Sequence, residues 1–408
     1  MNCRFCKKKL SKEFIDLGKM APSNSYVTKK NLKGIHNEYK LKTLICDSCW
    51  LVQTQDFVEV SEMFTPDYVY FSSFSSTWIE HAKKFVNDMI SRCLLNKSSF
   101  VVEIASNDGY LLQFVNQNGI PCLGVEPTNE TAAVASDKGL NVLNKFFSHD
   151  LGQKITNDYG HADLIVANNV LAHVPEPLDL LKGIETLLKE DGLASIEFHS
   201  LKELVNKVAI DTIYHEHFSY YSLISFKFLA KAAGLKVVDV EKLSTHGGSL
   251  RVYLSRKNSL QSLSPTVQKQ LDEEAASGLN KLSTFHEFSK KIDGLKISYI
   301  KFLQDMKNND LKVAGYGAAA KASTLLNYAD ISSDLITMIA DKSPSKIGKY
   351  VPGCQVPIVD VEKLVNFDPD VVVIFPWNIK DEIIKELSPR LKSTVKFYKF
   401  VPEITELL

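Results

Sequence analysis

The sequence predicts an α/β protein with a small cysteine-bearing module at its N-terminus, followed by two Rossmann-like sheets. Apolar, strand-like segments recur roughly every 20–30 residues between helical stretches from Ser99 to Phe198, a spacing typical of a doubly wound parallel sheet. A second strand, glycine turn and helix begins at Leu311. Two Cys-x-x-Cys pairs precede both sheets. We therefore expect three domains, at 1–75, 76–257 and 258–408.

The charge and apolar content of the chain argue against several kinds of partner. Its 408 residues carry 48 basic and 48 acidic side chains, so the net charge is zero. This balance gives no reason to expect that the protein binds nucleic acid or an acidic membrane surface. No apolar run approaches the roughly 20 residues that span a bilayer. The chain has seven cysteines, an odd number, and its N-terminal residues lack the apolar core of a signal peptide. Together these features indicate reduced thiols and a cytoplasmic protein. We expect a monomer or a weak homo-oligomer.

Four of the cysteines have the spacing of a metal site. Cys3 and Cys6 form one Cys-x-x-Cys knuckle, and Cys46 and Cys49 form the other. Four thiolates can surround one Zn²⁺ as a tetrahedron and leave no open coordination position, so we expect a structural zinc ion. A pair of redox dithiols is the alternative. The remaining cysteines are expected to be inert core thiols: Cys93, Cys122 and Cys354.

The first strand of the central sheet ends in a turn that suits a ligand. Glu103 lies in this strand, and Ser106-Asn107-Asp108-Gly109 leads from it into an apolar helix. A turn that contains glycine lets a ligand approach backbone N–H groups at a helix start. The turn lacks a full Gly-x-Gly-x-x-Gly, which argues against a dinucleotide.

Later segments add candidate contacts around the same sheet. Glu126, followed by Pro127, ends the second strand, where a carboxylate is well placed to hold ribose hydroxyls. Phe146 belongs to an aromatic pair able to stack on an adenine. The fourth strand ends in amides. A hairpin over 236–255 is expected to close the sheet. Its bend is either a plain glycine turn or a loop that reaches the substrate. The residues at these two places are Asn168, Asn169 and His173 after the strand, and His246 and Gly247 at the bend.

The run Tyr214-His215-Glu216-His217 is the clearest candidate for acid–base chemistry. Histidine titrates nearest neutrality, a neighbouring glutamate can orient or charge-stabilise an imidazolium, and tyrosine can donate to an oxygen that becomes negative. The choice between the two histidines stays open, because residues two apart share a face in a strand and diverge in a helix. A satisfied structural network is the alternative to a catalytic cluster. Two other histidines are expected at the surface: His81 and His286.

A second Rossmann-like unit is predicted after long connecting helices over 258–308. A strand leads into Gly315-Tyr316-Gly317, small residues follow, and a helix begins near Lys321. Small residues let a phosphate approach the helix N-terminus, and Lys321 can add positive charge. We therefore expect a nucleotide or diphosphate to bind here. The candidate contacts are Tyr316, Gly317, Ala320, Lys321 and Asn378.

These motifs together resemble the nucleotide-sugar 3-C-methyltransferases over essentially the whole chain. The resemblance is carried by the four cysteines, by Glu-Ile-Ala-Ser-Asn-Asp-Gly from Glu103, by Tyr-His-Glu-His-Phe from Tyr214 and by Gly-Tyr-Gly-Ala-Ala-Ala-Lys from Gly315. It implies that the central sheet is a class I domain that binds S-adenosylmethionine (SAM). It also implies a nucleoside-diphosphate 4-keto-deoxysugar as the substrate, held by the C-terminal domain.

The resemblance implies a role for each of the candidate residues. His217 is then the general base with Glu216 beside it, while Tyr214 and an N-terminal tyrosine, Tyr68 or Tyr70, stabilise an enolate. His215 is the other candidate for the base, and its alternative role is to hold the loop. A histidine can remove a proton next to a ketone once the developing oxyanion is hydrogen-bonded. The implied SAM contacts are Glu103, Ser106, Asn107 and Gly109 for the methionine part, Glu126 and Pro127 for the ribose, and Phe146, Asn168, Asn169 and His173 around the adenine and the edge of the fourth strand.

Two other functions fit part of this pattern. The same scaffold could methylate a sugar oxygen or nitrogen, which needs a base but no groups that stabilise an enolate. A zinc-containing protein that binds nucleotide sugars without catalysis is the second alternative. The presence of Tyr214, Glu216 and His217 together argues against the latter.

Overall fold

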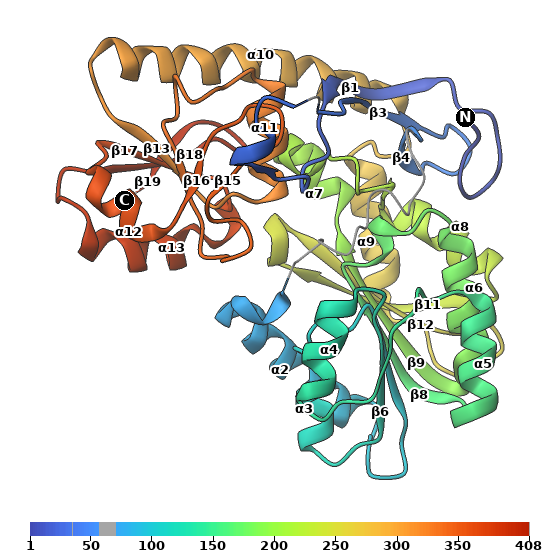
Figure 1. Ribbon diagram of the computed structural model, residues 1–408. Coiled ribbons are helices and arrows are strands. Elements are labelled where there is room, and N and C mark those ends of the chain that lie inside the picture. The colour runs from blue at the N-terminus through green and yellow to red at the C-terminus, as the bar shows by residue number, and fades with distance from the viewer. Residues whose placement is uncertain (35, 57–70, 408) are drawn as a thin grey trace.

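The computed structural model describes residues 1–34, 36–56 and 71–407, and this part of the chain contains four sheets (Figure 1). Tyr68 and Tyr70 lie outside the described residues. The N-terminal part is a small antiparallel sheet with short flanking turns. Its elements are β1 Lys12–Met20, β2 Val27–Thr28, η1 Lys29–Asn31, β3 Tyr39–Ile45, β4 Val52–Thr54 and η2 Ser72–Phe74.

The central part is a seven-stranded sheet in the order β11-β12-β9-β8-β5-β6-β7. All neighbouring strands are parallel except for the pairs that include β12, which is antiparallel to both β9 and β11. Its elements are α2 Ser76–Arg92, β5 Val101–Ile104, α3 Leu112–Gln117, β6 Cys122–Val125, α4 Asn129–Asp137, β7 Val142–Leu143, α5 His149–Tyr159, β8 Ala162–Asn168, η3 Leu171–His173, α6 Pro177–Leu187, β9 Leu188–His199, α7 Leu201–Asn206, η4 Ile210–Thr212, β10 Ser219–Tyr220, α8 Leu223–Ala232, β11 Leu235–Leu243, η5 Thr245–Gly247 and β12 Ser249–Arg256.

The C-terminal part is a second sheet, in the order β16-β14-β13-β17-β18-β19, that is parallel except at β19. Two helices connect it to the central part, as the sequence predicts. Its elements are α9 Pro265–Ala276, α10 Leu282–Asn308, β13 Val313–Tyr316, α11 Ala320–Tyr328, β14 Ile339–Ala340, β15 Lys349–Tyr350, β16 Ile358–Val359, α12 Val361–Phe367, β17 Val371–Ile374, η6 Trp377–Ile379, α13 Lys380–Leu387, η7 Ser388–Arg390, β18 Lys396–Lys399 and β19 Thr405–Leu407.

In both parallel sheets, later strands of the chain lie on both sides of the first strand, so the direction in which strands are added changes there. In the central sheet β5 lies between β6 and β8, and in the C-terminal sheet β13 lies between β14 and β17. The loops that leave the carboxyl ends of two such strands run in opposite directions and open a crevice between them, where ligands of open α/β sheets bind. The turn after Glu103 and the turn at Gly317 lie at these two positions.

Helix α10 links the N-terminal and C-terminal parts. It runs along one side of the molecule from one part to the other (Figure 1). Near its start, Phe288 stacks on Phe14 of β1 with ring centroids 4.8 Å apart. About three turns further along, Tyr299 stacks on Phe400 with ring centroids 4.9 Å apart and donates a hydrogen bond to the Phe400 carbonyl oxygen. Burying these rings holds both parts against the same helix.

Two short strand pairings cross between the predicted domains. Strand β10, which follows the Tyr214–His217 run, pairs with β4 and extends the N-terminal sheet. Strand β2 pairs with β15 of the C-terminal part. The N-terminal module is therefore joined by backbone hydrogen bonds to both of the larger parts, and the predicted acid–base segment lies where the three meet.

Candidate active site

The four cysteines of the two knuckles meet at one point. Their sulfur atoms all lie within 4.8 Å of one another, with Sγ–Sγ distances of 3.6 Å for Cys3–Cys49 and 3.5 Å for Cys6–Cys46. Four Zn–S bonds of about 2.3 Å in a tetrahedron require sulfurs about 3.8 Å apart, so the donor set fits zinc. This site closes the hairpin of β3 and β4, because Cys46 and Cys49 form the turn between them.

The carboxyl edge of β5 and β8 carries polar atoms without partners. Both carboxylate oxygens of Glu103, the Ser106 hydroxyl and Oδ1 of Asn168 are buried without a hydrogen-bond partner among the described residues. Burial raises the pKa of Glu103 well above its usual value; the nearby Tyr110 hydroxyl acts against this, while the Glu126 and Asp108 carboxylates add to it. Such atoms are costly unless a ligand satisfies them, so this edge fits a polar ligand with a cationic group, as the methionine part of SAM has.

The turn after β5 is shaped by the backbone as well as by side chains. Gly109 has φ +76°, and a Cβ there would lie 2.2 Å from Leu140 Cδ1. Glu126 accepts hydrogen bonds from the backbone nitrogens of Asn107 and Thr128, each at 2.9 Å. It therefore fixes the turn in addition to its predicted role toward the ribose. Phe146 is 62% exposed, which leaves its ring open to a stacking partner.

The segment 211–220 holds His217 in a single tautomer. The turn from Tyr214 to His217 brings the two rings to 3.9 Å between centroids, and the His173 ring lies 4.7 Å from that of His217. His217 Nδ1 lies 2.9 Å from the carbonyl oxygen of Thr212. A carbonyl oxygen only accepts, so Nδ1 carries the proton and Nε2 keeps its lone pair. His217 is thus prepared to take a proton at Nε2.

Burial also sets the charge state of this imidazole. It lowers the pKa of His217 well below its usual value, and the nearby His173, His199 and Lys321 act in the same direction. The ring is therefore neutral at neutral pH, which is the form that a general base requires.

The structure separates the two histidines and corrects the predicted role of Glu216. His215 is fully buried and its Nε2 lies 3.2 Å from the carbonyl oxygen of Tyr39 in β3, so it anchors the loop to the N-terminal sheet. The Glu216 carboxylate does not orient His217, because the Thr212 carbonyl occupies Nδ1 instead. Glu216 Oε1 accepts from the backbone and side-chain nitrogens of Asn24, and its backbone carbonyl lies 2.9 Å from His173 Nδ1. Adjacent side chains in a turn point in different directions, which spacing alone does not show.

The hairpin bend lies beside the amides of β8. Asn169 Nδ2 lies 3.3 Å from His246 Nε2, and the Trp78 ring packs against His246 at 5.3 Å.

The prediction that His81 lies at the surface was wrong. Its Nε2 lies 3.0 Å from Glu197, which is fully buried and also bound by Arg251. The signal missed in the sequence is that Glu197 ends a central strand, where a buried carboxylate requires partners.

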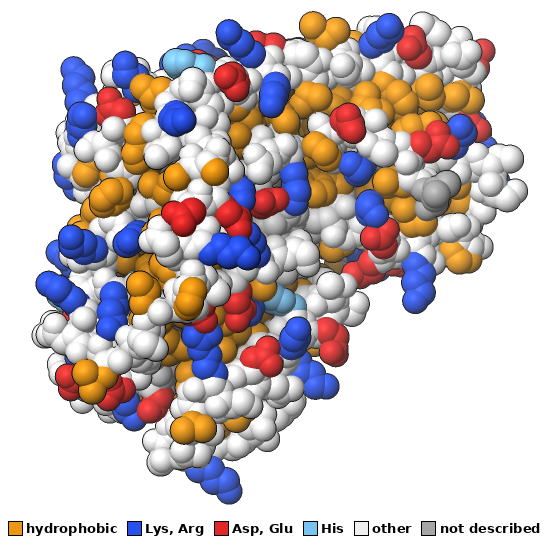
Figure 2. All heavy atoms as spheres, turned by 180° about the vertical axis from the view of Figure 1, so that it is seen from behind, with side chains coloured by type: hydrophobic (Ala, Val, Ile, Leu, Met, Phe, Trp, Pro, Cys, Tyr) orange, Lys and Arg blue, Asp and Glu red, His pale blue; other side chains and the backbone are white. Residues whose placement is uncertain are grey.

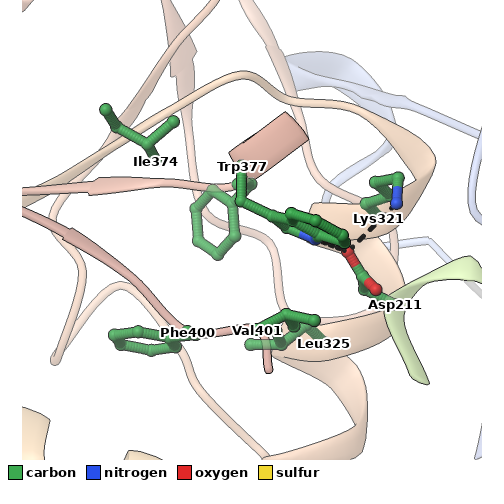
Figure 3. Close-up of a pocket in the computed structure, with 8 residues that line it drawn as sticks. Asp211, Lys321, Leu325, Ile374, Trp377, Phe400 and Val401 are labelled. Atoms are coloured by element: carbon green, nitrogen blue, oxygen red, sulfur yellow. Dashed lines mark hydrogen bonds and ion pairs between the residues drawn. The ribbon is translucent and has the colours of Figure 1, made fainter. Parts of the chain in front are cut away.

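The C-terminal part meets the acid–base segment at Asp211 (Figure 3). The sequence predicts that the Lys321 ammonium group is available to a diphosphate. In the structure it is paired instead: its Nζ lies 3.4 Å from Asp211 Oδ2 and 5.0 Å from the centre of the Trp377 ring. Trp377 Nε1 donates to the same oxygen at 2.8 Å. Asp211 lies three residues before Tyr214 and Trp377 follows β17, but nothing in the sequence pairs them.

The predicted diphosphate site lies at the N-terminus of α11, which no side chain caps. Helix α11 begins at Ala320 after Ala319. Gly317 has φ +87°, and a Cβ there would lie 2.3 Å from Pro376, so only glycine fits. The Tyr316 side chain is 5% exposed and packs in the apolar core of this sheet, so its ring is not available to a ligand. Asn378 lies in η6, next to Trp377.

Comparisons with known proteins agree with this three-part arrangement. Family models match residues 3–64 as a zinc binding domain, 78–240 as a methyltransferase domain and 244–402 as a C-methyltransferase C-terminal domain. C-methyltransferase NovU of Streptomyces niveus is 30% identical over 401 residues, which cover 98% of this chain and 95% of NovU. This chain belongs to the C-methyltransferase family. The C-methyltransferase is SAM-dependent, has the class I fold in its central part and carries a four-cysteine cluster in its zinc binding domain.

Solved structures resemble only part of the C-methyltransferase. Magnesium protoporphyrin IX methyltransferase from Synechocystis PCC 6803, with bound SAH, is 15% identical, with 44% of this chain and 83% of that chain covered and a TM-score of 0.36. The PH0226 protein from Pyrococcus horikoshii OT3 is 13% identical, with 49% and 100% covered and a TM-score of 0.39.

Among the described residues, no helix combines the length and apolarity needed to cross a bilayer. Figure 2 shows Lys and Arg side chains interspersed with Asp and Glu over one face.

Proposed function

We propose that this C-methyltransferase acts on a nucleoside-diphosphate 4-keto-deoxysugar and methylates the carbon next to the ketone, at C3. The observation that carries the proposal is the environment of His217: a neutral imidazole with Nδ1 fixed on the Thr212 carbonyl and Nε2 available, with the Tyr214 ring 3.9 Å away. A base of this kind, next to a phenol that can donate to an oxyanion, suits removal of a carbon-bound proton beside a ketone.

His217 Nε2 would take the proton as the C–H bond breaks and its electron pair moves into the enolate. Tyr214 would donate a hydrogen bond to the oxygen that becomes negative. The enolate carbon then forms its new bond to the methyl group. When bound, SAM supplies an electrophilic methyl on sulfonium sulfur and leaves as S-adenosylhomocysteine. Glu103, Ser106 and Asn168 are the residues proposed to hold its polar end.

The nucleoside diphosphate is proposed to lie at the start of α11. The first N–H groups of a helix point out of its N-terminus and favour anions, and the small side chains of the half-buried Ala319 and Ala320 suit the approach of a phosphate. This end of α11 packs against η4, which precedes the His217 turn. A sugar attached to the diphosphate would therefore reach toward His217. We place the reaction in the cytoplasm, where thiolates that hold zinc stay reduced.

Deuterium exchange separates this proposal from O- or N-methylation. A panel of nucleoside-diphosphate 4-keto-6-deoxysugars is incubated with the enzyme in D₂O without SAM, and proton NMR follows the C3 position. We expect exchange at C3 with at least one member, none with a 4-hydroxy analogue, and a gain of one methyl on the same sugar when SAM is added. A His217→Asn variant should bind S-adenosylhomocysteine but exchange at least about 100-fold more slowly. A methylated product without any exchange in the wild-type enzyme would overturn the proposal.

A further inference from the structure

A buried carboxylate joins the C-terminal part to the turn that precedes the acid–base segment. Asp211 is 1% exposed, and its Oδ2 accepts from Trp377 Nε1 at 2.8 Å and pairs with Lys321 Nζ at 3.4 Å. Trp377 comes from η6 and Lys321 from the first turn of α11 (Figure 3). Two helical elements of the C-terminal part thus hold one residue of the central part.

Asp211 is adjacent to the group that sets the tautomer of His217. It lies in the single turn η4, between Ile210 and Thr212. The Thr212 carbonyl accepts the Nδ1 proton of His217 at 2.9 Å. Within this turn, Thr212 donates from its backbone nitrogen and from Oγ1 to the Ala209 carbonyl, and the Asp211 side chain ties the same turn to the C-terminal part.

Stability alone is a weak reason to keep this arrangement. Asp211 Oδ1 is buried without a hydrogen-bond partner among the described residues, and removing a carboxylate and an ammonium from water costs free energy that a single ion pair often fails to recover. An apolar contact between η4 and α11 would join the two parts without that cost. The directional hydrogen bond from Trp377, in contrast, fixes orientation.

We propose that Asp211, Lys321 and Trp377 are positioning residues, through which the C-terminal domain holds the Thr212 carbonyl and keeps His217 Nε2 free to act as a base. The proposal rests on the proposed function, because it takes His217 as the base. It makes proton removal depend on the docking of η6 and α11 against η4.

The tautomer of His217 can be observed without any substrate. Nitrogen-15 NMR of the full-length, zinc-loaded enzyme labelled at histidine gives different patterns for Nδ1–H and Nε2–H imidazoles, and the His217 signals are assigned by their loss in His217→Asn. We expect the Nδ1–H pattern in the wild type. In Asp211→Asn and in the milder Trp377→Phe, which keeps the aromatic ring, we expect a mixture of the two patterns. Unchanged His217 signals in both variants would overturn the proposal.

Kinetics on the sugar nucleotide that the wild type exchanges provide the second measurement. We expect both variants to lower kcat for exchange by roughly tenfold to a hundredfold, as expected for a misplaced catalytic group, with KM within about twofold. A raised KM with unchanged kcat would place Asp211 and Trp377 in substrate binding instead and overturn the proposal. Affinity for S-adenosylhomocysteine confirms that each variant is folded.

A matched control tests another contact between the same two parts. Thr77 of α2 donates to Glu382 of α13 at 2.6 Å, far from η4 in the chain. Thr77→Val should leave both the His217 signals and kcat unchanged; an effect equal to that of Trp377→Phe would mean that general loosening, not positioning, explains the result. Full exchange activity in His217→Asn would instead refute the proposed function, while the tautomer measurement would still test the role of Asp211.

Discussion

At the scale of single residues, the environment of each side chain decides which chemistry it offers. His215 and His217 are the same residue type two positions apart, yet one is buried against the Tyr39 carbonyl and the other contacts the rings of Tyr214 and His173. Glu103 and Glu126 both end central strands, yet the oxygens of Glu126 are bonded to backbone nitrogens while those of Glu103 have no partner among the described residues. Each difference leads to a measurement.

The pH dependence of exchange should reveal the lowered pKa of His217. A histidine of ordinary pKa would lose half of its base form near pH 6.5 as the pH falls. Burial lowers the pKa of His217, so we expect kcat/KM for C3 exchange to stay constant down through pH 6.5 and to fall only at lower pH. A loss of half the activity near pH 6.5 or above would contradict this assignment.

Replacing Glu103 should weaken the binding of the cofactor. Glu103→Gln keeps the size of the side chain but removes the charge that would face the ammonium group of SAM. Losing one partner of a buried charged pair costs about 2 kcal/mol or more, so we expect an affinity for S-adenosylhomocysteine roughly thirtyfold lower or worse by calorimetry. Glu130→Gln on the exposed side of α4 is the control. Equal affinities of the two variants for S-adenosylhomocysteine would show that Glu103 does not contribute to the binding of the cofactor.

At the scale of elements, the hairpin bend of β11 and β12 contacts the C-terminal part through a glycine. Gly247 has φ +88°, and a Cβ there would lie 2.2 Å from Trp377 Cη2. Gly160 has nearly the same φ, +87°, with nothing within 4 Å of such a Cβ. The pair therefore separates backbone strain from the contact with Trp377.

We expect Gly160→Ala to lower the free energy of unfolding by about 1–2 kcal/mol through backbone strain alone. Gly247→Ala should cost about 1–3 kcal/mol more, because Trp377 or the bend must move, and it should also lower kcat for exchange. Urea unfolding and the exchange assay give the two quantities. Equal losses of stability in both variants, with normal exchange in Gly247→Ala, would show that the bend and Trp377 are not coupled.

At the scale of the whole molecule, buried histidines make the fold sensitive to acid. Burial lowers the pKa of His173, His215 and His246 to about 4 and that of His199 to about 3. Between about pH 6.5 and pH 4 the unfolded chain binds protons that the folded chain does not, so stability falls as the pH falls. Each such histidine contributes a slope of up to about 1.4 kcal/mol per pH unit.

Urea unfolding at pH 7, 6 and 5 with excess zinc should show this loss, and His199→Gln should make the slope smaller. His286 is exposed, so His286→Gln should leave it unchanged. Zinc release is followed separately with a chromogenic chelator, since acid also protonates thiolates. A slope that follows zinc release and is the same in all three proteins would assign acid sensitivity to the metal site instead.

Much of this architecture could be predicted from the sequence because the signals are local. The Cys-x-x-Cys spacing indicates a zinc site, alternating apolar strands and helices indicate parallel sheets, and a glycine turn after a strand indicates a ligand edge. These patterns depend on residues a few positions apart, so the zinc cysteines, the turn after Glu103 and the start of α11 near Lys321 were all identifiable.

What only the tertiary structure decided depends on residues far apart in the chain. Lys321 and Trp377 lie 110 and 166 positions from Asp211, and Asn24 lies 192 positions from Glu216. The assignment of Nε2 as the free nitrogen of His217, the anchoring of His215 on Tyr39 and the pairing of His81 with Glu197 all follow from such contacts. The sequence by itself determined which chemical groups are present and which elements carry them. The tertiary structure determined which group faces which, because hydrogen bonds and burial depend on neighbours in space that residue spacing does not specify.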